Sequence, residues 1–377
     1  MAARSMLEEL PPQTVPLREV EPTIARLVES TDDLVPGPIH RARMSNLVIF
    51  SDSRERALAI DAVVPDIIEI HPARVISLIA EPATGDEALV TTVLLRRNIA
   101  NHRQVSEQIT LEARGPAIAH LPFALRELLI GDLPTNLWWA VRTPPALAGP
   151  LLHELAEPAQ QVLFDSHEWL EPHRGVAALD AWLDRLDRPG DVPARRRTAS
   201  DLNWRRIRVW RRILAEGLCP TVVPGVLESI TEVEIEHGPH AVTQAWAIAG
   251  WLSGRLGWTP KTHRVAPGEE LSFLMTTRSG AELRLRLIRR PSGPSALQSI
   301  RVGCAKAACM PSMCFALDRD DRIALTSDAE GNSPRTTAIG PRELGEVVGR
   351  QLSDREPDPI FREAMHHAHR LARLIHV

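Results

Sequence analysis

A histidine and two arginines near the ends of predicted strands are the first residues that could do chemistry. His71 and Arg74 lie in the segment that leads into a strand at 74–80, and Arg96 ends a strand at 88–96. If these side chains converged in one cleft, they could bind a sugar phosphate or a nucleotide. For His71 and Arg74 the sequence favours a simpler interpretation, an ordinary turn whose arginine pairs with a surface carboxylate.

Two polar residues, Glu107 and Gln108, follow one another in a predicted strand at 104–113. Because successive side chains of a strand point to opposite faces of the sheet, we expect at least one of them to point inward. A buried polar side chain needs a hydrogen-bond partner. The pair therefore indicates either a structural network or part of a binding site, and the sequence leaves both open.

A predicted helix at 201–218 opens with polar and aromatic residues that could bind another molecule. Its candidate binding residues are Asp201, Asn203, Trp204, Arg205, Arg208 and Arg211. Trp204, Arg208 and Arg211 share one helix face, and tryptophan with arginine is typical of protein-binding hot spots. Asp201 or Asn203 could instead serve only as the helix N-cap. The face could equally pack between two domains, so both interpretations stay open.

Cysteines and histidines form two further groups. Cys304, Cys309 and Cys314 are spaced by five, with Cys219 far away, whereas structural zinc ligands usually lie closer together. They could bind metal or act in redox control, but buried cysteines at strand edges are favoured. The C-terminal histidines are His366, His367, His369 and His376. We expect them on a solvated helix face, with no metal bound.

Motifs for nucleotide binding and for acyl transfer are absent from the sequence. There is no Walker phosphate loop and no G-x-S-x-G elbow. The first predicted strand is followed by FSDSRER at 50–56, where a dinucleotide fold would carry G-x-G-x-x-G. Without those glycines the backbone cannot approach a pyrophosphate closely. The sequence therefore predicts neither a classical dinucleotide site nor another cofactor.

The composition excludes several function classes. The chain has 377 residues, 44% of them hydrophobic, and a formal net charge of −4, which gives no general attraction to nucleic acid or to an acidic membrane. Its first ten residues lack an apolar signal core, and no long uncharged apolar run is present. Four cysteines do not make a disulfide framework. These features favour a cytoplasmic protein.

The first half of the chain alternates strands with helices. Strands are predicted at 44–50, 74–80, 88–96, 104–113, 135–141 and 161–165, and helices at 53–64, 117–130 and 176–186. This rhythm is typical of an α/β domain with an open, mostly parallel sheet covered by helices on both faces, Rossmann-like but without the glycine loop. The pair at 88–113 is predicted to be an antiparallel addition.

The second half turns mostly to strands. A strand is predicted at 231–237 and a helix at 241–256. Between that helix and the final helices at 342–351 and 359–375, strands at 271–277, 281–290, 296–303, 313–318 and 322–326 predict an antiparallel meander. Leu283, Leu285 and Leu287 alternate with arginines, so one sheet face should be apolar and the other charged. We predict a lead-in at 1–38, partly disordered or one short helix, an N-terminal α/β domain at 39–190 and a C-terminal α+β domain at 200–377.

Short motifs in order along the chain resemble one known family. They are NLVI at 46–49, HPARVI at 71–76, SEQI at 106–109, DLP at 132–134, LWW at 137–139, DS at 165–166, DLNW at 201–204 and WR at 210–211. Over roughly residues 40 to 330, the set resembles the OpcA family, the glucose-6-phosphate dehydrogenase assembly proteins of cyanobacteria and actinobacteria.

The resemblance implies an auxiliary protein without catalytic residues or cofactor. Family members bind glucose-6-phosphate dehydrogenase and promote its active oligomer or activate it, which controls the oxidative pentose phosphate pathway and NADPH supply. Glucose 6-phosphate is a candidate effector. Two positions depart from the family pattern: Val105 stands where a cysteine is common, and Ala73 where serine is more frequent. Redox control through position 105 is therefore not expected here. The competing hypothesis is an enzyme or sensor that binds a sugar phosphate or nucleotide at the strand ends.

Overall fold

The computed structural model describes most of the chain. The described residues are 7–32, 40–82, 87–98, 104–187, 197–221, 223–266, 270–305, 312–318, 321–328, 335–340 and 343–375. They form two compact units, each built from three stretches of sequence. Unit 1 comprises Met1–Asp165, Leu186–Leu202 and Glu343–Pro357, and unit 2 comprises Ser166–Arg185, Asn203–Arg342 and Asp358–Val377. The contiguous domains predicted at 39–190 and 200–377 differ from these interleaved units.

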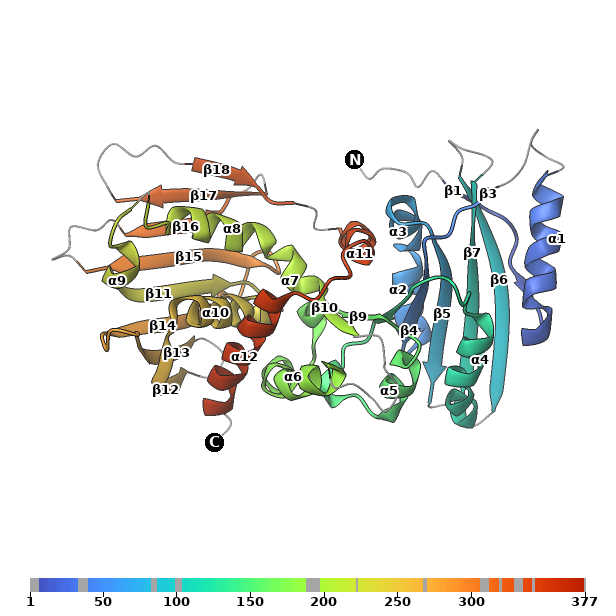
Figure 1. Cartoon of the computed structure of the whole chain (residues 1–377), viewed down its shortest axis with the longest axis horizontal. Coiled ribbons are helices and arrows are strands. Elements are labelled where there is room, and N and C mark those ends of the chain that lie inside the picture. Colours follow the sequence, from blue (N-terminus) through green and yellow to red (C-terminus); the bar gives the residue numbers. More distant parts are fainter. Residues whose placement is uncertain are drawn as a thin grey trace. The chain divides into compact units, whose positions relative to one another are not determined.

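Unit 1 is built on a mostly parallel sheet with the strand order β1-β6-β7-β5-β4-β8-β9-β10 (Figure 1). Its strands are β1 (Leu7–Glu9), β2 (Gln13–Thr14), β3 (His40–Arg41), β4 (Ser45–Ser51), β5 (Ala73–Glu81), β6 (Ala88–Asn98), β7 (Gln104–Arg114), β8 (Thr135–Trp139), β9 (Gln161–Phe164) and β10 (Thr198–Asp201). Every residue of β4 is buried, as expected of a central strand covered on both faces. The antiparallel addition is confirmed, because β6 pairs antiparallel with β7.

Helices cover both faces of this sheet. They are α1 (Val20–Asp32), α2 (Arg54–Asp61), α3 (Val64–Ile70), α4 (Leu121–Leu128), α5 (Pro150–Ala156) and α11 (Leu344–Leu352), with short 3-10 turns at Leu17–Glu19, Gly115–His120 and Pro145–Leu147. Helix α1 corresponds to the short helix predicted in the lead-in. The sequence pattern does not predict α3, or the two short strands of the lead-in, β1 and β2, which pair with β6.

Unit 2 contains a second sheet in the order β12-β13-β14-β11-β15-β16-β17-β18. Its strands are β11 (Ile230–His237), β12 (Thr259–Ala266), β13 (Glu270–Thr276), β14 (Glu282–Arg289), β15 (Leu297–Cys304), β16 (Met313–Leu317), β17 (Arg322–Ser327) and β18 (Arg335–Ala338). Neighbouring strands are antiparallel except β11 and β14, which are parallel. The predicted meander is thus present but interrupted, because β11 lies between β14 and β15.

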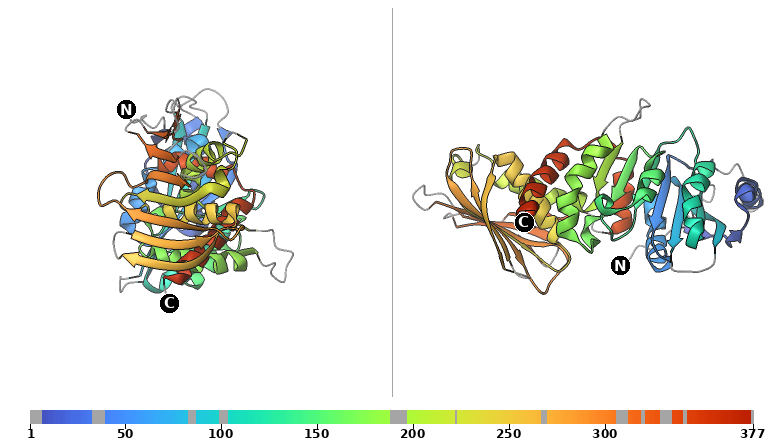
Figure 2. Two further views of the ribbon diagram at one scale, coloured as in Figure 1. Left: turned by 90° about the vertical axis from the view of Figure 1, so that its left-hand side faces the viewer. Right: turned by 90° about the horizontal axis from the view of Figure 1, so that it is seen from below.

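The helices of unit 2 lie against one face of its sheet, and no described helix covers the other face (Figure 2). They are α6 (Pro172–Asp187), α7 (Leu202–Arg206), α8 (Arg208–Gly217), α9 (Val226–Ser229), α10 (Val242–Leu256) and α12 (Pro359–Leu374), with a 3-10 turn at Ser166–Glu168. The single helix predicted at 201–218 is divided into α7 and α8 at Ile207. Among the described residues, none of the helices is long and apolar enough to cross a membrane.

Candidate interaction surface

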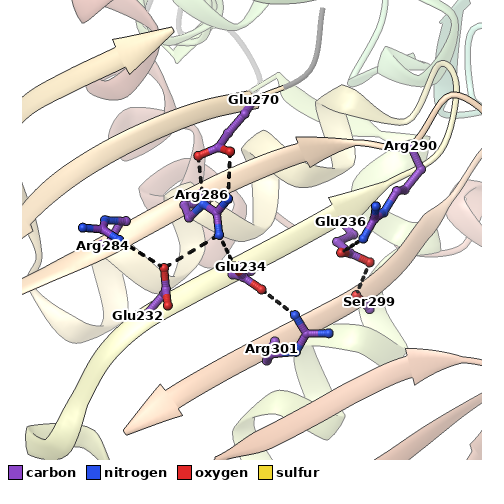
Figure 3. Close-up of polar contacts among 9 residues, drawn as sticks. All are labelled: Glu232, Glu234, Glu236, Glu270, Arg284, Arg286, Arg290, Ser299 and Arg301. Carbon is purple, nitrogen blue, oxygen red and sulfur yellow. Dashed lines mark hydrogen bonds and ion pairs between the residues drawn. The ribbon is translucent and has the colours of Figure 1, made fainter. Parts of the chain in front are cut away.

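The uncovered face of the unit 2 sheet carries alternating rows of charge. Along β11 the burial alternates strictly from Glu232 to His237, so the apolar residues point to the helices and Glu232, Glu234 and Glu236 point outward. The neighbouring β14 places Arg284 and Arg286 beside Glu232 and Glu234. The sheet therefore presents a row of carboxylates flanked by arginines (Figure 3). We call this face, from β13 to β15, the charged face.

Arg286 is the centre of this network. Its Nε and Nη2 atoms each donate to a Glu270 carboxylate oxygen over 2.8 Å, and its Nη1 donates to Glu234. Glu234 also accepts from Arg301 Nη1 at 2.6 Å. A bidentate arginine pair is the strongest form of this interaction. Hydrogen bonds from Arg286 hold the pKa of Glu270 below its usual value, and those to Glu270 raise the pKa of Arg286.

The other members extend the network along the strands. Glu236 accepts from Arg290 and, at 2.8 Å, from Ser299 Oγ. Partial burial alone would raise the pKa of Glu236, but these hydrogen bonds outweigh it and lower the pKa. Glu232 lies 3.8 Å from Arg284 Nη1. Glu236 and Glu270 are therefore ionised at neutral pH.

Three arginines of the charged face are far more exposed than the two central carboxylates, while Arg286 itself is 27% exposed. The side chains of Arg284, Arg290 and Arg301 are 63%, 51% and 52% exposed, whereas Glu234 and Glu236 are only 13% and 12% exposed. A molecule that approaches this face meets guanidinium groups first. By the strand register, Arg264 and Arg322 lie on the same face and are exposed, so positive charge continues to both sides.

The residues predicted from the sequence lie elsewhere, and several belong to buried networks of unit 1. Glu107 is 3% exposed. It pairs with Arg41 at 2.5 Å, with Arg43 at 2.8 Å and with Arg74 at 3.2 Å. Arg74 is also 3% exposed and donates to Glu21 of α1. Glu21 is 57% exposed, so the pairing of Arg74 with a surface carboxylate is confirmed, and the buried Glu107 adds a second carboxylate beside it.

Gln108 and Arg96 form a separate network on the opposite face of the same sheet. Arg96, 1% exposed, donates to Gln108, and its Nη2 lies 3.3 Å from Asp61 of α2. Gln108 Nε2 in turn donates to Asp61 at 2.7 Å. The prediction that Glu107 and Gln108 point to opposite faces is confirmed. Both networks are buried inside unit 1, which agrees with the structural network and not with the binding site that the sequence also left open.

The structure does not bring His71, Arg74 and Arg96 into one cleft. Arg74 pairs with Glu107 and Arg96 with Gln108, which places the two arginines on opposite faces of the sheet. The imidazole of His71 contacts Ser45 Oγ at 3.1 Å and Ser353 Oγ at 3.2 Å. The predicted convergence of the three side chains in one cleft is wrong, because Arg74 and Arg96 lie on opposite faces of the sheet.

Asn203 and Trp204 are buried within unit 2. Asn203 Nδ2 donates to Thr243 Oγ1 at 2.8 Å, and its Oδ1 accepts from Gln244 at 2.7 Å, so it is a link to α10 and not the helix cap. Trp204, 5% exposed, donates from Nε1 to Asp358 at 2.8 Å. The Trp204 indole therefore stabilises the packing of α7 against α12 inside unit 2, and it is not accessible to a partner.

The remaining predicted positions of this helix differ in exposure. The guanidinium of Arg211 stacks 3.4 Å from the centre of the Trp204 ring, and burial lowers its pKa to about 10, which still leaves it charged at neutral pH. Asp201 is buried at the end of β10. Arg205 is half-buried, and Arg208 is exposed. Arg208 is thus the predicted residue that is most accessible to a partner.

The cysteines and C-terminal histidines that the structure describes are dispersed. Cys219, Cys304 and Cys314 are free thiols, and Cys304 and Cys314 point to opposite faces of the sheet. No group of three or more potential ligands close enough to hold a metal occurs among the described residues. His366 contacts Asp180, and His369 contacts the carbonyl of Ala177. Cys309 and His376 lie outside the described residues.

Both halves of the chain match known protein domains. Residues 64–181 match the glucose-6-phosphate dehydrogenase subunit N-terminal domain, and residues 197–365 match the corresponding C-terminal domain; these are the two domains of OpcA proteins. The chain belongs to the OpcA family. The family identified from the short motifs is thereby confirmed.

Three OpcA relatives from cyanobacteria show how much of the family pattern the chain shares. It is 24% identical over 310 residues to an OxPP cycle protein OpcA of Synechocystis sp., covering 78% of this chain and 62% of the relative. The OpcA of Nostoc punctiforme is 29% identical, with 53% of this chain and 41% of the relative covered. That of Synechococcus elongatus is 26% identical, with 53% and 43% covered. The chain thus spans less than two thirds of each of these relatives.

Solved structures that match this chain include two that are described as an oxidoreductase and a 3-ketoreductase. An oxidoreductase from Sinorhizobium meliloti has a TM-score of 0.48 at 12% identity, covering 89% of this chain and 97% of that one. A 3-ketoreductase from Actinomadura kijaniata has a TM-score of 0.49 at 10% identity, covering 89% and 96%.

The charged face of this OpcA protein was only partly visible in its sequence. The alternation of leucine and arginine in β14 predicts one charged sheet face. That alternation does not reveal the carboxylates of β11. Strands β11 and β14 are separated by 44 residues of the chain, and only their parallel pairing places Glu232 beside Arg284. The outward glutamates at 232, 234 and 236 were the available signal.

Proposed function

We propose that this protein is a non-catalytic assembly factor that binds glucose-6-phosphate dehydrogenase in the cytoplasm and promotes its active oligomer. The observation that carries the proposal is that both halves of the chain match domains described by that enzyme's name. The relatives are described as proteins of the OxPP cycle, in agreement with a role beside this enzyme.

The first strand-to-helix turn of unit 1 supports a non-catalytic role. Between β4 and α2 the chain reads Asp52, Ser53 and Arg54 without a glycine. Ser53 Oγ accepts from the backbone N–H of Arg56, so the helix N-terminus that would receive a pyrophosphate in a dinucleotide fold is capped by its own side chain. A sheet of this kind without the phosphate-binding turn can serve as a scaffold.

The charged face of unit 2 is the surface that we propose for contact with the enzyme. Its exposed groups are mainly guanidiniums, and arginine is enriched in protein interfaces. The complementary surface of the dehydrogenase should therefore be rich in carboxylates. Complementary charge of this type speeds association and makes it sensitive to salt.

Size-exclusion chromatography of this protein with its cognate dehydrogenase tests the surface. Replacement of both exposed arginines, Arg284→Glu with Arg301→Glu, should reduce co-elution and weaken binding at least about tenfold. The control is Arg212→Glu with Arg255→Glu, which gives the same charge change on exposed residues of α8 and α10. Equal loss of binding in both variants would contradict the surface assignment. Unchanged co-elution of the first variant would contradict it as well.

A further inference from the structure

Unit 2 contains a pocket of about 550 Å³ on the helix-covered side of its sheet. The pocket is bounded by β11 to β14, the start of α10 and the segment before α6. Its apolar walls include Trp169, Leu170, Val242, Val265, Leu271 and Leu287. This volume lies within the range of small-molecule sites, roughly 300–1,000 Å³. Glu270 of the charged face also lines the pocket, at the start of β13. The exposed Arg284 and Arg301 lie on the other side of the sheet, so the pocket does not depend on the function proposed above.

Two histidines give the pocket fixed polar groups. His237 is 4% exposed, and its Nδ1 lies 2.9 Å from the carbonyl of Gly238, so that nitrogen donates and Nε2 is the acceptor. Burial lowers the pKa of His237, and its imidazole is therefore neutral at pH 7. Trp246 Nε1 donates to His173 Nδ1 at 3.1 Å, which fixes the position of the second ring. Nε2 of His237 thus offers the pocket a hydrogen-bond acceptor.

Arg289 supplies positive charge at the same pocket. It continues the inward series of Leu285 and Leu287 on β14, yet its side chain is exposed and lines the pocket. Within the described ranges no carboxylate lies within ion-pair distance of Arg289, in contrast to Arg290, which pairs with Glu236. The nearby Leu170 and Val265 are 64% and 42% exposed. An unpaired guanidinium beside exposed apolar side chains is suited to an amphipathic anion.

We propose that this pocket binds a small organic anion with an apolar or aromatic body. The anionic group would pair with Arg289, and the body would lie against Trp169 and the leucines of β13 and β14. The neutral imidazole of His237 would fix its orientation by accepting one hydrogen bond. A metal-bound ligand is not part of the proposal, because no metal-binding group occurs in the described part of the chain.

Fluorescence titration of the full chain with 8-anilinonaphthalene-1-sulfonate tests this site, because the probe has an aromatic body and one sulfonate. Saturable binding is expected, and Arg289→Ala should weaken it at least about tenfold through loss of a charge-assisted contact. Arg290→Ala is the matched control, since its side chain lies on the charged face. Equal affinity of the Arg289→Ala and native proteins for the probe would overturn the proposal.

Two further measurements distinguish the effect of the probe's charge from the effect of the pocket's shape. The uncharged analogue N-phenyl-1-naphthylamine has the same body without the sulfonate, so Arg289→Ala should leave its affinity unchanged. Ala266→Trp places a large side chain in the pocket wall and should abolish binding of both probes, with folding checked by circular dichroism. Binding of the sulfonate probe that survives Ala266→Trp in a folded protein would place the probe elsewhere and overturn the proposal.

Discussion

At the scale of single residues, the buried polar groups of unit 1 are structural. Glu107 is the common partner of Arg41, Arg43 and Arg74, and Arg74 is almost fully buried. A buried guanidinium is tolerated only when a carboxylate compensates its charge. The network therefore contributes to the stability of unit 1 mainly because it leaves no unpaired charge in the interior.

Replacement of Glu107 by glutamine tests this role. Glu107→Gln should lower the free energy of unfolding by about 3 kcal/mol, because Arg74 keeps only the half-exposed Glu21 as a charged partner. Urea denaturation followed by circular dichroism measures the change. The control is Glu8→Gln, whose loss breaks an exposed pair with Arg97 and should cost less than about 1 kcal/mol. Similar losses in both variants would contradict the buried-charge explanation.

His71 should make unit 1 sensitive to mild acid. Burial, with Arg355 adding to it, lowers the pKa of His71 below its usual 6.5 in the folded protein. Near pH 6.5 the unfolded chain binds a proton on His71 that the folded protein does not bind. The stability that the neutral imidazole preserves is therefore complete above about pH 6.5, and it is lost as the pH falls toward the folded-state pKa.

Urea unfolding at several pH values between 5 and 7 checks this sign. His71→Gln should reduce the slope of unfolding free energy against pH by at most about 1.4 kcal/mol per pH unit, the effect of one proton. A variant that keeps the full slope of the native protein would show that other groups cause the acid sensitivity.

At the scale of elements, close helix packing in unit 1 depends on two glycines of α11. A side chain at Gly345 would place its Cβ 2.6 Å from Asp66 Cβ, and one at Gly349 would place it 2.9 Å from Ile70 Cβ. The backbone of α11 therefore lies directly against α3. This contact attaches a segment of the C-terminal part of the chain, Glu343–Pro357, to unit 1.

Even the smallest side chain should disturb this contact. Gly345→Ala should destabilise unit 1 by about 1–3 kcal/mol, because the overlap with α3 outweighs the gain in helix propensity. Thermal unfolding measures the effect. Arg350→Ala, on the exposed side of the same helix, should change stability by less than about 0.5 kcal/mol. A stabilised Gly345→Ala protein would contradict the close packing.

The sequence predicted elements better than it predicted their neighbours. The apolar run of α10 and the alternation of β14 have a period that identifies a helix and a strand. The position of β11 between β14 and β15 depends on long-range pairing that no local pattern contains. Strand β12 was missed because its side chains are mostly exposed, so it lacks the apolar alternation that identifies a half-buried strand.

The candidate sites show the same limit. Trp204 and Arg211 were correctly placed near one another on a helical segment, since they contact in the structure. Their shared face could not reveal that Asp358, more than 150 residues later, would cover the indole. The pocket at Arg289 was not predicted at all, because its lining comes from several separate segments.

At the scale of the whole molecule, the protein combines a Rossmann-like sheet without a phosphate-binding turn with a second sheet that exposes one charged face. Membership of the OpcA family and the match of both halves to domains named for glucose-6-phosphate dehydrogenase support a role exercised through contact with that enzyme. Binding through the charged face should weaken as ionic strength rises, because exposed charges are screened.

The most direct test of this role is the rate of NADPH formation by the cognate glucose-6-phosphate dehydrogenase, with and without this protein, together with the size distribution of the mixture. If this protein assembles the enzyme, we expect a higher rate and a shared larger species, both reduced by Arg284→Glu with Arg301→Glu. An unchanged rate and separate elution of two properly folded proteins would contradict it.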